Sequence, residues 1–254
     1  LDVREIIAEA KRQLKQEADY EAEARHLMRF RELVRDEPRI RIPAHHPDFS
    51  TRHVLAMDRM LGRPIEDLRG PEYPQQLSDE IGATLQRLMF RELFEFRFVQ
   101  TDPNFANYLF DPDAGALVLL DFGSAREFHA EFVENFRVIV RAMIEEDHEA
   151  IRAAAVAIGY LSGNEPPDRQ QSVVDLISMV GEPLRCNGVY DFDESQLAAR
   201  ARDVGFDLVF REGFIRAPPP ETIFLHRKLG GTFLLCARIK ARVDTGALIA
   251  PFLA

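Results

Sequence analysis

Three side chains in the middle of the sequence have the types and the spacing that phosphoryl transfer requires. Asp102 and Asn107 lie five residues apart in a loop, and Asp121 follows an apolar run and precedes Phe122–Gly123. This chemistry needs a carboxylate that orients or deprotonates the acceptor, and oxygen ligands that hold Mg²⁺ on the phosphates. Kinase catalytic loops have the same D-x-x-x-x-N spacing, followed by Asp-Phe-Gly. We therefore predict Asp102 as the catalytic base and Asn107 and Asp121 as the magnesium ligands.

Either motif alone is common in ordinary turns, so the prediction depends on their order. Between the two motifs lie two short apolar runs, Tyr108–Phe110 and Ala116–Leu120, joined by the turn sequence Asp111–Gly115. This pattern predicts a β-hairpin that returns the chain to its starting point. Both motifs around one hairpin indicate a kinase-type nucleotide site. Small-molecule phosphotransferases share this skeleton, so the pattern does not identify the acceptor.

The elements around this segment are predicted to be mainly helical. Apolar residues recur at three- and four-residue steps from Val3 to Val34, and a second helix is expected to begin with Ser78 as its N-cap. Short strands are expected at Arg39–Ile42 and His53–Met57. A turn-rich stretch at Leu61–Pro74 is the expected boundary between two parts of the chain. Beyond residue 127 the pattern is helical again.

Composition excludes several classes of protein. The 254 residues are 46% hydrophobic and 29% charged, which suits a globular chain of one large or two modest domains. A net charge of −10 without a basic block argues against duplex nucleic acid as a partner. No apolar run approaches the roughly 20 residues of a membrane-spanning helix. Cys186 and Cys236 are expected to be buried free thiols, and the Phe-rich run 90–98 is expected to be core.

Several segments resemble one family, the UbiB/ADCK atypical kinases, and within it the coenzyme Q branch. The resemblance covers nearly the whole chain. The segments that carry it are Glu17–Ala24, Arg91–Phe96, Thr101–Tyr108, Leu119–Glu127, Pro218–Glu221 and Leu225–Gly231.

The resemblance implies an α+β, mainly helical, protein-kinase-like fold. Residues 1–60 would be an N-lobe remnant with the E-x-D helix, strands and hinge, and residues 61–254 a C-lobe with the catalytic loop, DFG and C-terminal helices. The implied activity is binding of ATP or ADP with Mg²⁺ and ATP hydrolysis or phosphoryl transfer, in support of ubiquinone biosynthesis. The implied partners are the nucleotide, ubiquinone-biosynthesis proteins and a membrane lipid surface.

The resemblance also assigns further residues. Glu23 would be the glutamate of helix αC that pairs with a nucleotide-holding lysine. Glu17 and Asp19 would be the E-x-D pair that binds the family's N-terminal K-x-G-Q segment. Asp58 to Met60 would be the hinge that meets adenine through its backbone.

The sequence departs from the family pattern at its N-terminal side. It contains no K-x-G-Q, no Ala- or Gly-rich phosphate loop and no strand bearing a V-A-I-K-like lysine, and it begins with Leu1 within a helical pattern. We therefore expect a truncated N-lobe, a chain that is inactive alone, and a full-length parent that is an ATP-dependent kinase or ATPase.

Two alternatives remain open: a pseudokinase-like scaffold of a lipid-biosynthetic complex, and a small-molecule phosphotransferase of the choline or aminoglycoside type. The 28 arginines against four lysines suggest a bacterial source. The protein would then be cytoplasmic or peripheral to the inner membrane, whereas a eukaryotic source would place it in mitochondria.

Overall fold

The computed structural model describes residues 19–210 and 219–254, which form two interleaved compact units. Unit 1 contains residues 19–67 and Gln100–Arg126, and unit 2 contains Leu68–Val99 and Glu127–Ala254. The chain therefore passes between the units three times, and the hairpin with both predicted motifs belongs to the same unit as the N-terminal segment. The assignment of lobes to residues 1–60 and 61–254 stays a prediction.

The described part of unit 1 begins with helix α2 (Tyr20–Leu33). Asp19 is its N-cap, with a non-helical backbone (φ −94°, ψ 79°) and a carboxylate that accepts from the Ala22 N–H at 2.9 Å. The continuous helix expected from Val3 therefore does not pass through Asp19. Its expected end before Pro38 is confirmed. The buried face of α2 consists of Ala24, Leu27 and Phe30.

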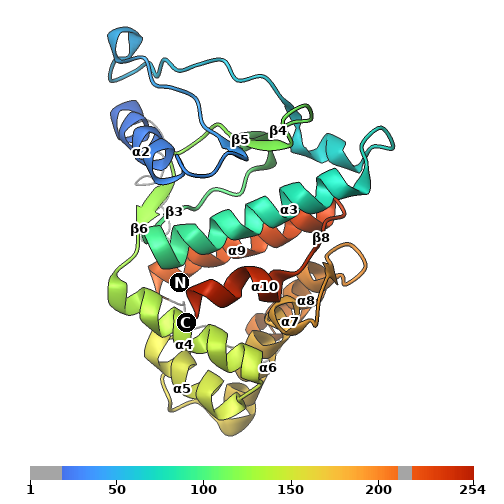
Figure 1. The fold of residues 1–254 in the computed structure, drawn as a ribbon. Coiled ribbons are helices and arrows are strands. Elements are labelled where there is room, and N and C mark those ends of the chain that lie inside the picture. Colours follow the sequence, from blue (N-terminus) through green and yellow to red (C-terminus); the bar gives the residue numbers. More distant parts are fainter. Residues whose placement is uncertain (1–18, 211–218) are drawn as a thin grey trace. The chain divides into compact units, whose positions relative to one another are not determined.

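A four-stranded sheet of order β1-β5-β4-β2 forms the rest of the framework of unit 1. Figure 1 labels its two central strands, β4 and β5. Its strands are β1 (Ile40–Arg41), β2 (Arg63–Pro64), β4 (Tyr108–Asp111) and β5 (Ala116–Leu119). Strands β4 and β5 pair antiparallel as the predicted hairpin, and β1 runs parallel to β5. All four residues of β5 are buried. The sheet is thus built around the hairpin that the turn sequence predicted.

The strand expected at His53–Met57 does not form. Only isolated bridges join His45 to Met57 and Thr51 to Val54. The hydroxyl oxygen of Ser50 accepts from the Ala56 N–H at 3.0 Å, so a side chain takes the place of a ladder partner. The short 3₁₀ helix η1 (Pro47–Phe49) precedes this bond.

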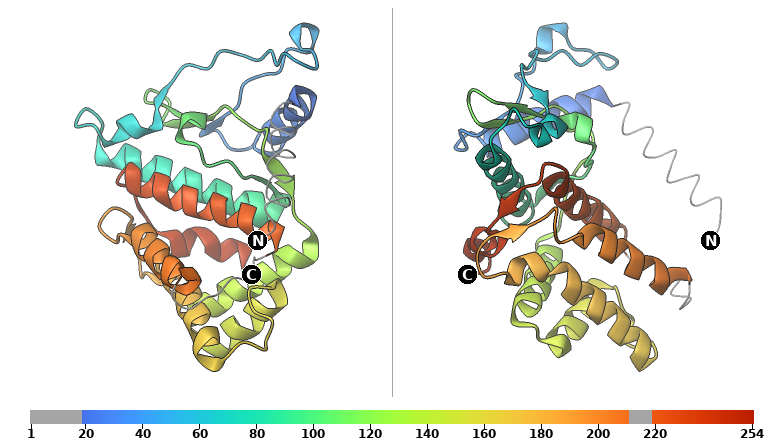
Figure 2. Two further views of the ribbon diagram at one scale, coloured as in Figure 1. Left: turned by 180° about the vertical axis from the view of Figure 1, so that it is seen from behind. Right: turned by 90° about the vertical axis from the view of Figure 1, so that its right-hand side faces the viewer.

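Unit 2 is helical, with α3 (Gln75–Phe90) and α9 (Pro220–Arg238) side by side (Figures 1 and 2). Gly82 of α3 allows the segment that follows α9 to approach closely, because a Cβ on Gly82 would lie 2.4 Å from Ala241 Cβ. The predicted N-cap Ser78 is wrong. The N-cap of α3 is Pro74, four residues earlier, and the buried Ser78 hydroxyl instead donates to the Leu68 carbonyl at 3.3 Å.

Helix α3 continues into a π-helix, η3 (Arg91–Phe96), which leads through β3 (Phe98–Gln100) to the predicted catalytic loop. In this run Phe90, Phe94 and Phe98 are buried, as expected, whereas Phe96 is half-buried. A buried ion pair joins Glu92 of η3 to Lys228 of α9, with 2.7 Å between Oε2 and Nζ.

The remaining elements complete a mainly helical α+β fold, as predicted. They are η2 (Ile65–Arg69), η4 (Phe105–Asn107), β6 (Ala125–Glu127), α4 (Ala130–Glu145), α5 (His148–Ile158), α6 (Pro167–Val180), α7 (Glu182–Arg185), β7 (Tyr190–Asp191), α8 (Leu197–Phe210), β8 (Arg242–Val243), α10 (Thr245–Ile249) and η5 (Ala250–Phe252). No helix within residues 19–210 and 219–254 has the length and apolar character needed to cross a membrane.

Candidate nucleotide and metal site

The predicted base and one predicted metal ligand contact each other directly. The Asn107 side-chain N–H donates to Asp102 Oδ2 at 2.9 Å. The bond is possible because residues 105–107 form the 3₁₀ turn η4, in which the Asn104 side chain accepts from the Ala106 N–H at 3.1 Å. The bond uses the amide nitrogen of Asn107, so the amide oxygen is not engaged by Asp102.

The catalytic loop is also tied to the strand before it and to the segment after DFG. The Gln100 side-chain N–H donates to the Asp102 carbonyl at 2.8 Å. The Thr101 hydroxyl donates to the Ser124 carbonyl at 2.7 Å, and the Thr101 N–H donates to the same oxygen at 3.3 Å. These bonds fix the backbone on both sides of the Asp102 carboxylate.

The hairpin register brings Asp121 to the same end as Asn107. Tyr108 pairs with Leu119, and the Leu120 N–H donates to the Asn107 carbonyl at 3.1 Å. Asp121 therefore directly follows Leu120, the residue that pairs with Asn107. Its Oδ1 accepts from the Gly123 N–H at 2.8 Å, which orients the carboxylate. The three predicted residues thus gather at the open end of one hairpin.

Glu23 of α2 lies against the same turn. A Cβ placed on Gly123 would be 3.4 Å from Asp121 Oδ1 and 3.7 Å from Glu23 Oε2, so both carboxylates border Gly123. Burial and the neighbouring Asp121 carboxylate raise the pKa of Glu23, although the N–H of Phe122 donates to Glu23 and acts in the opposite direction. The expected lysine partner is absent from the described part of unit 1, which contains no lysine.

Two further residues of α2 contact Phe122, and the sequence motifs did not identify them. His26 Nδ1 lies 3.0 Å from the Phe122 carbonyl oxygen. The Phe30 and Phe122 rings are 5.0 Å apart between centroids. Their spacing in the sequence could have identified them, because residues 23, 26 and 30 lie on one face of a helix and so share a face with the predicted Glu23.

The other predicted residues lie elsewhere in unit 1 or outside the described residues. Glu17 lies outside them. The Asp19 carboxylate caps α2, as described above. The Asp58 carboxylate joins the two ends of the segment 44–58. It accepts from the Ala44 N–H at 3.0 Å and lies 2.8 Å from His46 Nε2. These two bonds lower the pKa of Asp58. Met60 is half-buried.

The donor set of this site fits magnesium. One amide oxygen and one carboxylate are hard oxygen ligands, and protein sites for Mg²⁺ commonly supply only one or two such groups beside water and phosphate oxygens. Nowhere in residues 19–210 and 219–254 do three or more His, Cys, Asp or Glu side chains cluster as metal ligands.

Comparison with known proteins gives the family of the chain. A sequence profile described as "ABC1 atypical kinase-like domain" matches residues 1–155. The chain belongs to the ABC1 atypical kinase-like family. The matched range contains the whole candidate site, from Glu23 to Gly123.

Relatives of this ABC1 chain include atypical kinases named mitochondrial. The chain is 37% identical over 227 residues to the atypical kinase COQ8B of Rattus norvegicus, covering 89% of the chain and 42% of the relative. It is 36% identical over 245 residues to the atypical kinase COQ8 of Saccharomyces cerevisiae, covering 95% of the chain and 48% of the relative. The chain thus spans less than half the length of these two relatives.

A solved structure has the same fold as this ABC1 chain. It is described as the complex of Rv3197 with erythromycin from Mycobacterium tuberculosis. The two chains superpose with a TM-score of 0.76 at 18% sequence identity, over 98% of this chain and 61% of the other.

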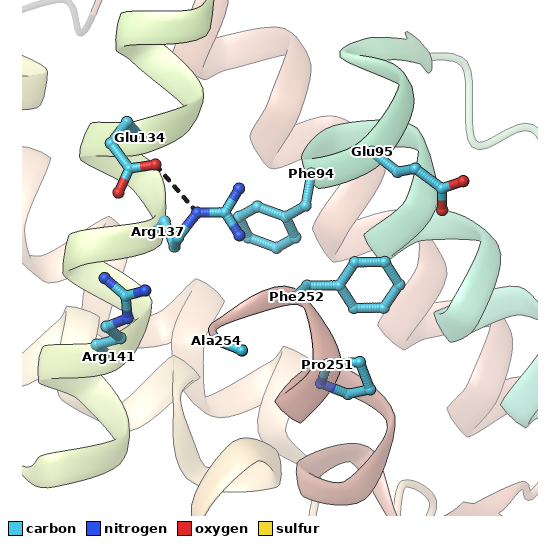
Figure 3. Close-up of a pocket in the computed structure, with 8 residues that line it drawn as sticks. All are labelled: Phe94, Glu95, Glu134, Arg137, Arg141, Pro251, Phe252 and Ala254. Atoms are coloured by element: carbon cyan, nitrogen blue, oxygen red, sulfur yellow. Dashed lines mark hydrogen bonds and ion pairs between the residues drawn. The ribbon is translucent and has the colours of Figure 1, made fainter.

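Unit 2 of the ABC1 chain has a separate surface cavity of about 480 Å³ (Figure 3). Arg137 and Arg141 of α4 form one wall. Arg137 pairs with Glu134 at 3.1 Å and lies over the Phe94 ring, and Arg141 donates to the Leu253 carbonyl at 3.0 Å. The predicted base and metal ligands, Asp102, Asn107 and Asp121, do not line this cavity.

Proposed function

We propose that this chain forms the Mg²⁺–nucleotide site of an atypical kinase or ATPase that supports ubiquinone biosynthesis. One observation carries the proposal: Asn107 donates to Asp102 at 2.9 Å, and the hairpin register sets Asp121 beside the residue that pairs with Asn107. A base and two oxygen ligands at one hairpin end are what transfer of a phosphoryl group to a hydroxyl or to water requires.

Each residue has a role in this proposal. The Asp102 carboxylate orients the acceptor hydroxyl or water and takes its proton, and the Asn107 amide holds that carboxylate in place. The Asn107 oxygen and the Asp121 carboxylate hold the ion. When bound, Mg²⁺ supplies positive charge that offsets the negative charge of the phosphate oxygens. The bond from Gly123 to Asp121 presets the direction of this carboxylate, which lowers the cost of ordering it on binding.

The proposal extends to residues and partners that the family resemblance implies. Asp58 to Met60 would meet adenine through their backbone, and Glu17 and Asp19 would bind a K-x-G-Q segment. Partners would be ubiquinone-biosynthesis proteins and a membrane lipid surface. A eukaryotic source would place the protein in mitochondria, and a bacterial source in the cytoplasm or at the inner membrane.

A scaffold without turnover is the second candidate. It is favoured by the surroundings of Glu23, which borders Asp121 and Gly123, since residues 19–67 and 100–126 of unit 1 contain no lysine. A nucleotide bound there would lack the cationic contact that Glu23 would otherwise orient.

A binding experiment with matched variants tests the proposed site. In the protein as its cell makes it, ADP binding should depend on Mg²⁺, and Asp121→Ala should remove most of that dependence. The loss of a charge-assisted contact corresponds to roughly a ten- to hundredfold weaker affinity. Asp113→Ala, in the exposed turn of the same hairpin, is the control and should behave as wild type. An unchanged metal dependence in Asp121→Ala would contradict the ligand role.

Turnover then separates the two candidates. ATP hydrolysis above an Asp102→Ala control supports the enzyme, whereas Mg²⁺-dependent binding without turnover supports the scaffold.

A further inference from the structure

Helix α2 holds the residue that follows Asp121 at three points. The Phe122 N–H donates to Glu23, the Phe122 carbonyl oxygen lies 3.0 Å from His26 Nδ1, and the Phe122 ring packs on Phe30 at 5.0 Å between centroids. Phe30 and Phe122 have no solvent exposure at all. One helix face therefore contacts both backbone polar groups and the side chain of a single residue.

We propose that His26 is a positioning residue for the metal ligand Asp121. This inference rests on the proposed function, because it takes Asp121 to be the residue that binds the ion. His26 does not touch the nucleotide or the ion in this proposal. It acts through the Phe122 carbonyl, and it is a residue to which the motifs of the site assign no role.

A single peptide group links His26 to the Asp121 carboxylate. A bond to the Phe122 carbonyl fixes the plane of the peptide between Phe122 and Gly123, because that peptide is rigid. The N–H of the same peptide belongs to Gly123 and donates to Asp121 Oδ1 at 2.8 Å. His26 and the Ala125 N–H, which donates to the Phe122 oxygen at 3.2 Å, hold the carbonyl of this peptide group, and Asp121 holds its N–H.

Because residue 123 is a glycine, the orientation of the peptide between Phe122 and Gly123 depends strongly on its hydrogen-bond partners. Gly123 has no Cβ, and its backbone reaches more conformations than that of any other residue. Without the His26 bond, only the longer bond from the Ala125 N–H, at 3.2 Å, would hold the carbonyl of this peptide, and the Gly123 N–H would leave Asp121 Oδ1 in part of the population. The carboxylate would then need to be ordered again when the ion binds.

The side chain at position 26 needs a donor at the place of Nδ1. His26 has one when the proton is on Nδ1, and the carbonyl, which only accepts, favours that tautomer. The amide nitrogen of asparagine lies at a similar distance from the backbone as Nδ1, whereas leucine fills the space without a donor. His26→Leu and His26→Asn thus differ in the proposed bond, and His53→Asn, at an exposed site of the same unit, is the control for loss of a histidine.

Amide hydrogen exchange of the segment 119–126, followed by mass spectrometry without nucleotide, tests the contact itself. His26→Leu should speed exchange in this segment by roughly three- to tenfold, as expected for the loss of one hydrogen bond. His26→Asn should restore most of the protection. Unchanged exchange in His26→Leu would overturn the proposal.

The Mg²⁺ concentration that gives half of the maximal ADP binding tests the positioning role. It should rise by about three- to tenfold in His26→Leu, return to within about twofold of wild type in His26→Asn, and stay unchanged in His53→Asn. A wild-type midpoint in His26→Leu, or a raised midpoint in His26→Asn as well, would overturn the proposal. A wild-type protein that binds ADP without any dependence on Mg²⁺ would instead contradict the proposed function, and the role of His26 in metal binding with it.

Discussion

The Asn107 amide donates to the Asp102 carboxylate at 2.9 Å, so a predicted metal ligand also holds the predicted base. We expect Asp102→Asn to lower ATP turnover by at least about 100-fold, the usual contribution of a general base. Nucleotide affinity should change by less than about threefold, because Asp102 is not expected to touch the ion. Steady-state hydrolysis and equilibrium binding on the same preparation measure the two effects. A parallel loss of affinity and turnover would show that Asp102 binds the nucleotide rather than acting as a base.

The pKa of Glu23 predicts a pH-dependent effect on stability. This pKa is raised above 4.5 by burial and by the Asp121 carboxylate, so the contribution of Glu23 to stability is present at low pH and is lost as the pH rises through its folded-state pKa. Glu23→Gln keeps an acceptor for the Phe122 N–H and removes the charge. It should therefore stabilise the protein at pH 7.5 but not at pH 4, as measured by urea unfolding at both pH values.

Glu21→Gln is the control for this prediction, since Glu21 is exposed in the same first turn of α2. It should give no gain at either pH. A destabilised Glu23→Gln protein at pH 7.5 would mean that the negative charge of Glu23 is needed for folding.

The ion pair between Glu92 and Lys228 predicts strongly non-additive mutations. Their side chains are only 1% and 4% exposed. Lys228→Met would leave a buried carboxylate without its cation and should cost about 3–5 kcal/mol of unfolding free energy. The double variant Glu92→Leu with Lys228→Met should recover most of this loss. Urea unfolding of the singles and the double measures the coupling, and simple additivity would contradict it.

Two helical glycines predict opposite effects of the same substitution. Gly82→Ala would set a Cβ 2.4 Å from Ala241 Cβ and should destabilise unit 2 by about 1–3 kcal/mol. Gly230→Ala, at an exposed position of α9 with no heavy atom within 4 Å of the new Cβ, should stabilise it by up to about 1 kcal/mol. Denaturant midpoints of the two variants measure the contrast. Equal effects at both positions would be inconsistent with the close packing at Gly82.

The two cysteines should differ in reactivity. Burial raises the pKa of Cys236 to about 12, and this thiol has no solvent exposure, whereas Cys186 is partly exposed. The expectation that both thiols are buried is thus confirmed only for Cys236. A thiol reagent at pH 8 should modify one cysteine per native chain, Cys186, and both in denaturant, since the thiolate is the reactive form. Labelling of Cys236 at the rate of Cys186 would indicate that unit 2 opens locally.

The parts of the site that could be predicted depend on short-range chemistry. The hairpin turn is one example: Asp111 Oδ1 accepts from the N–H groups of Asp113 and Ala114, and Gly115 has a φ of 58°. All partners lie within five residues, so the turn sequence contains the whole interaction. The spacing of Asp102 and Asn107 is equally local, and the structure pairs them.

The parts that were missed depend on partners distant in sequence. His26 meets Phe122 across 96 residues, and no local pattern marks such a contact. The N-cap at Ser78 was wrong for the same reason, because the Leu68 carbonyl is a competing partner ten residues away. The π-helix η3 and the buried Lys228 likewise follow from packing in unit 2. The sequence motifs identified the chemical groups, but not the side chains that hold them.

The interleaving of the two units has a consequence for synthesis on the ribosome. Unit 1 cannot be complete until Arg126 has emerged, because its second segment is Gln100–Arg126. By then all of α3 has been made, but α9, which packs against it, begins only at Pro220. The apolar face of α3 therefore stays uncovered until about a hundred further residues have been synthesised. At typical elongation rates this synthesis takes roughly 5–20 s. During that interval the nascent chain exposes a helix that its own sequence cannot yet cover, so we expect it to be a substrate for chaperones that bind apolar segments.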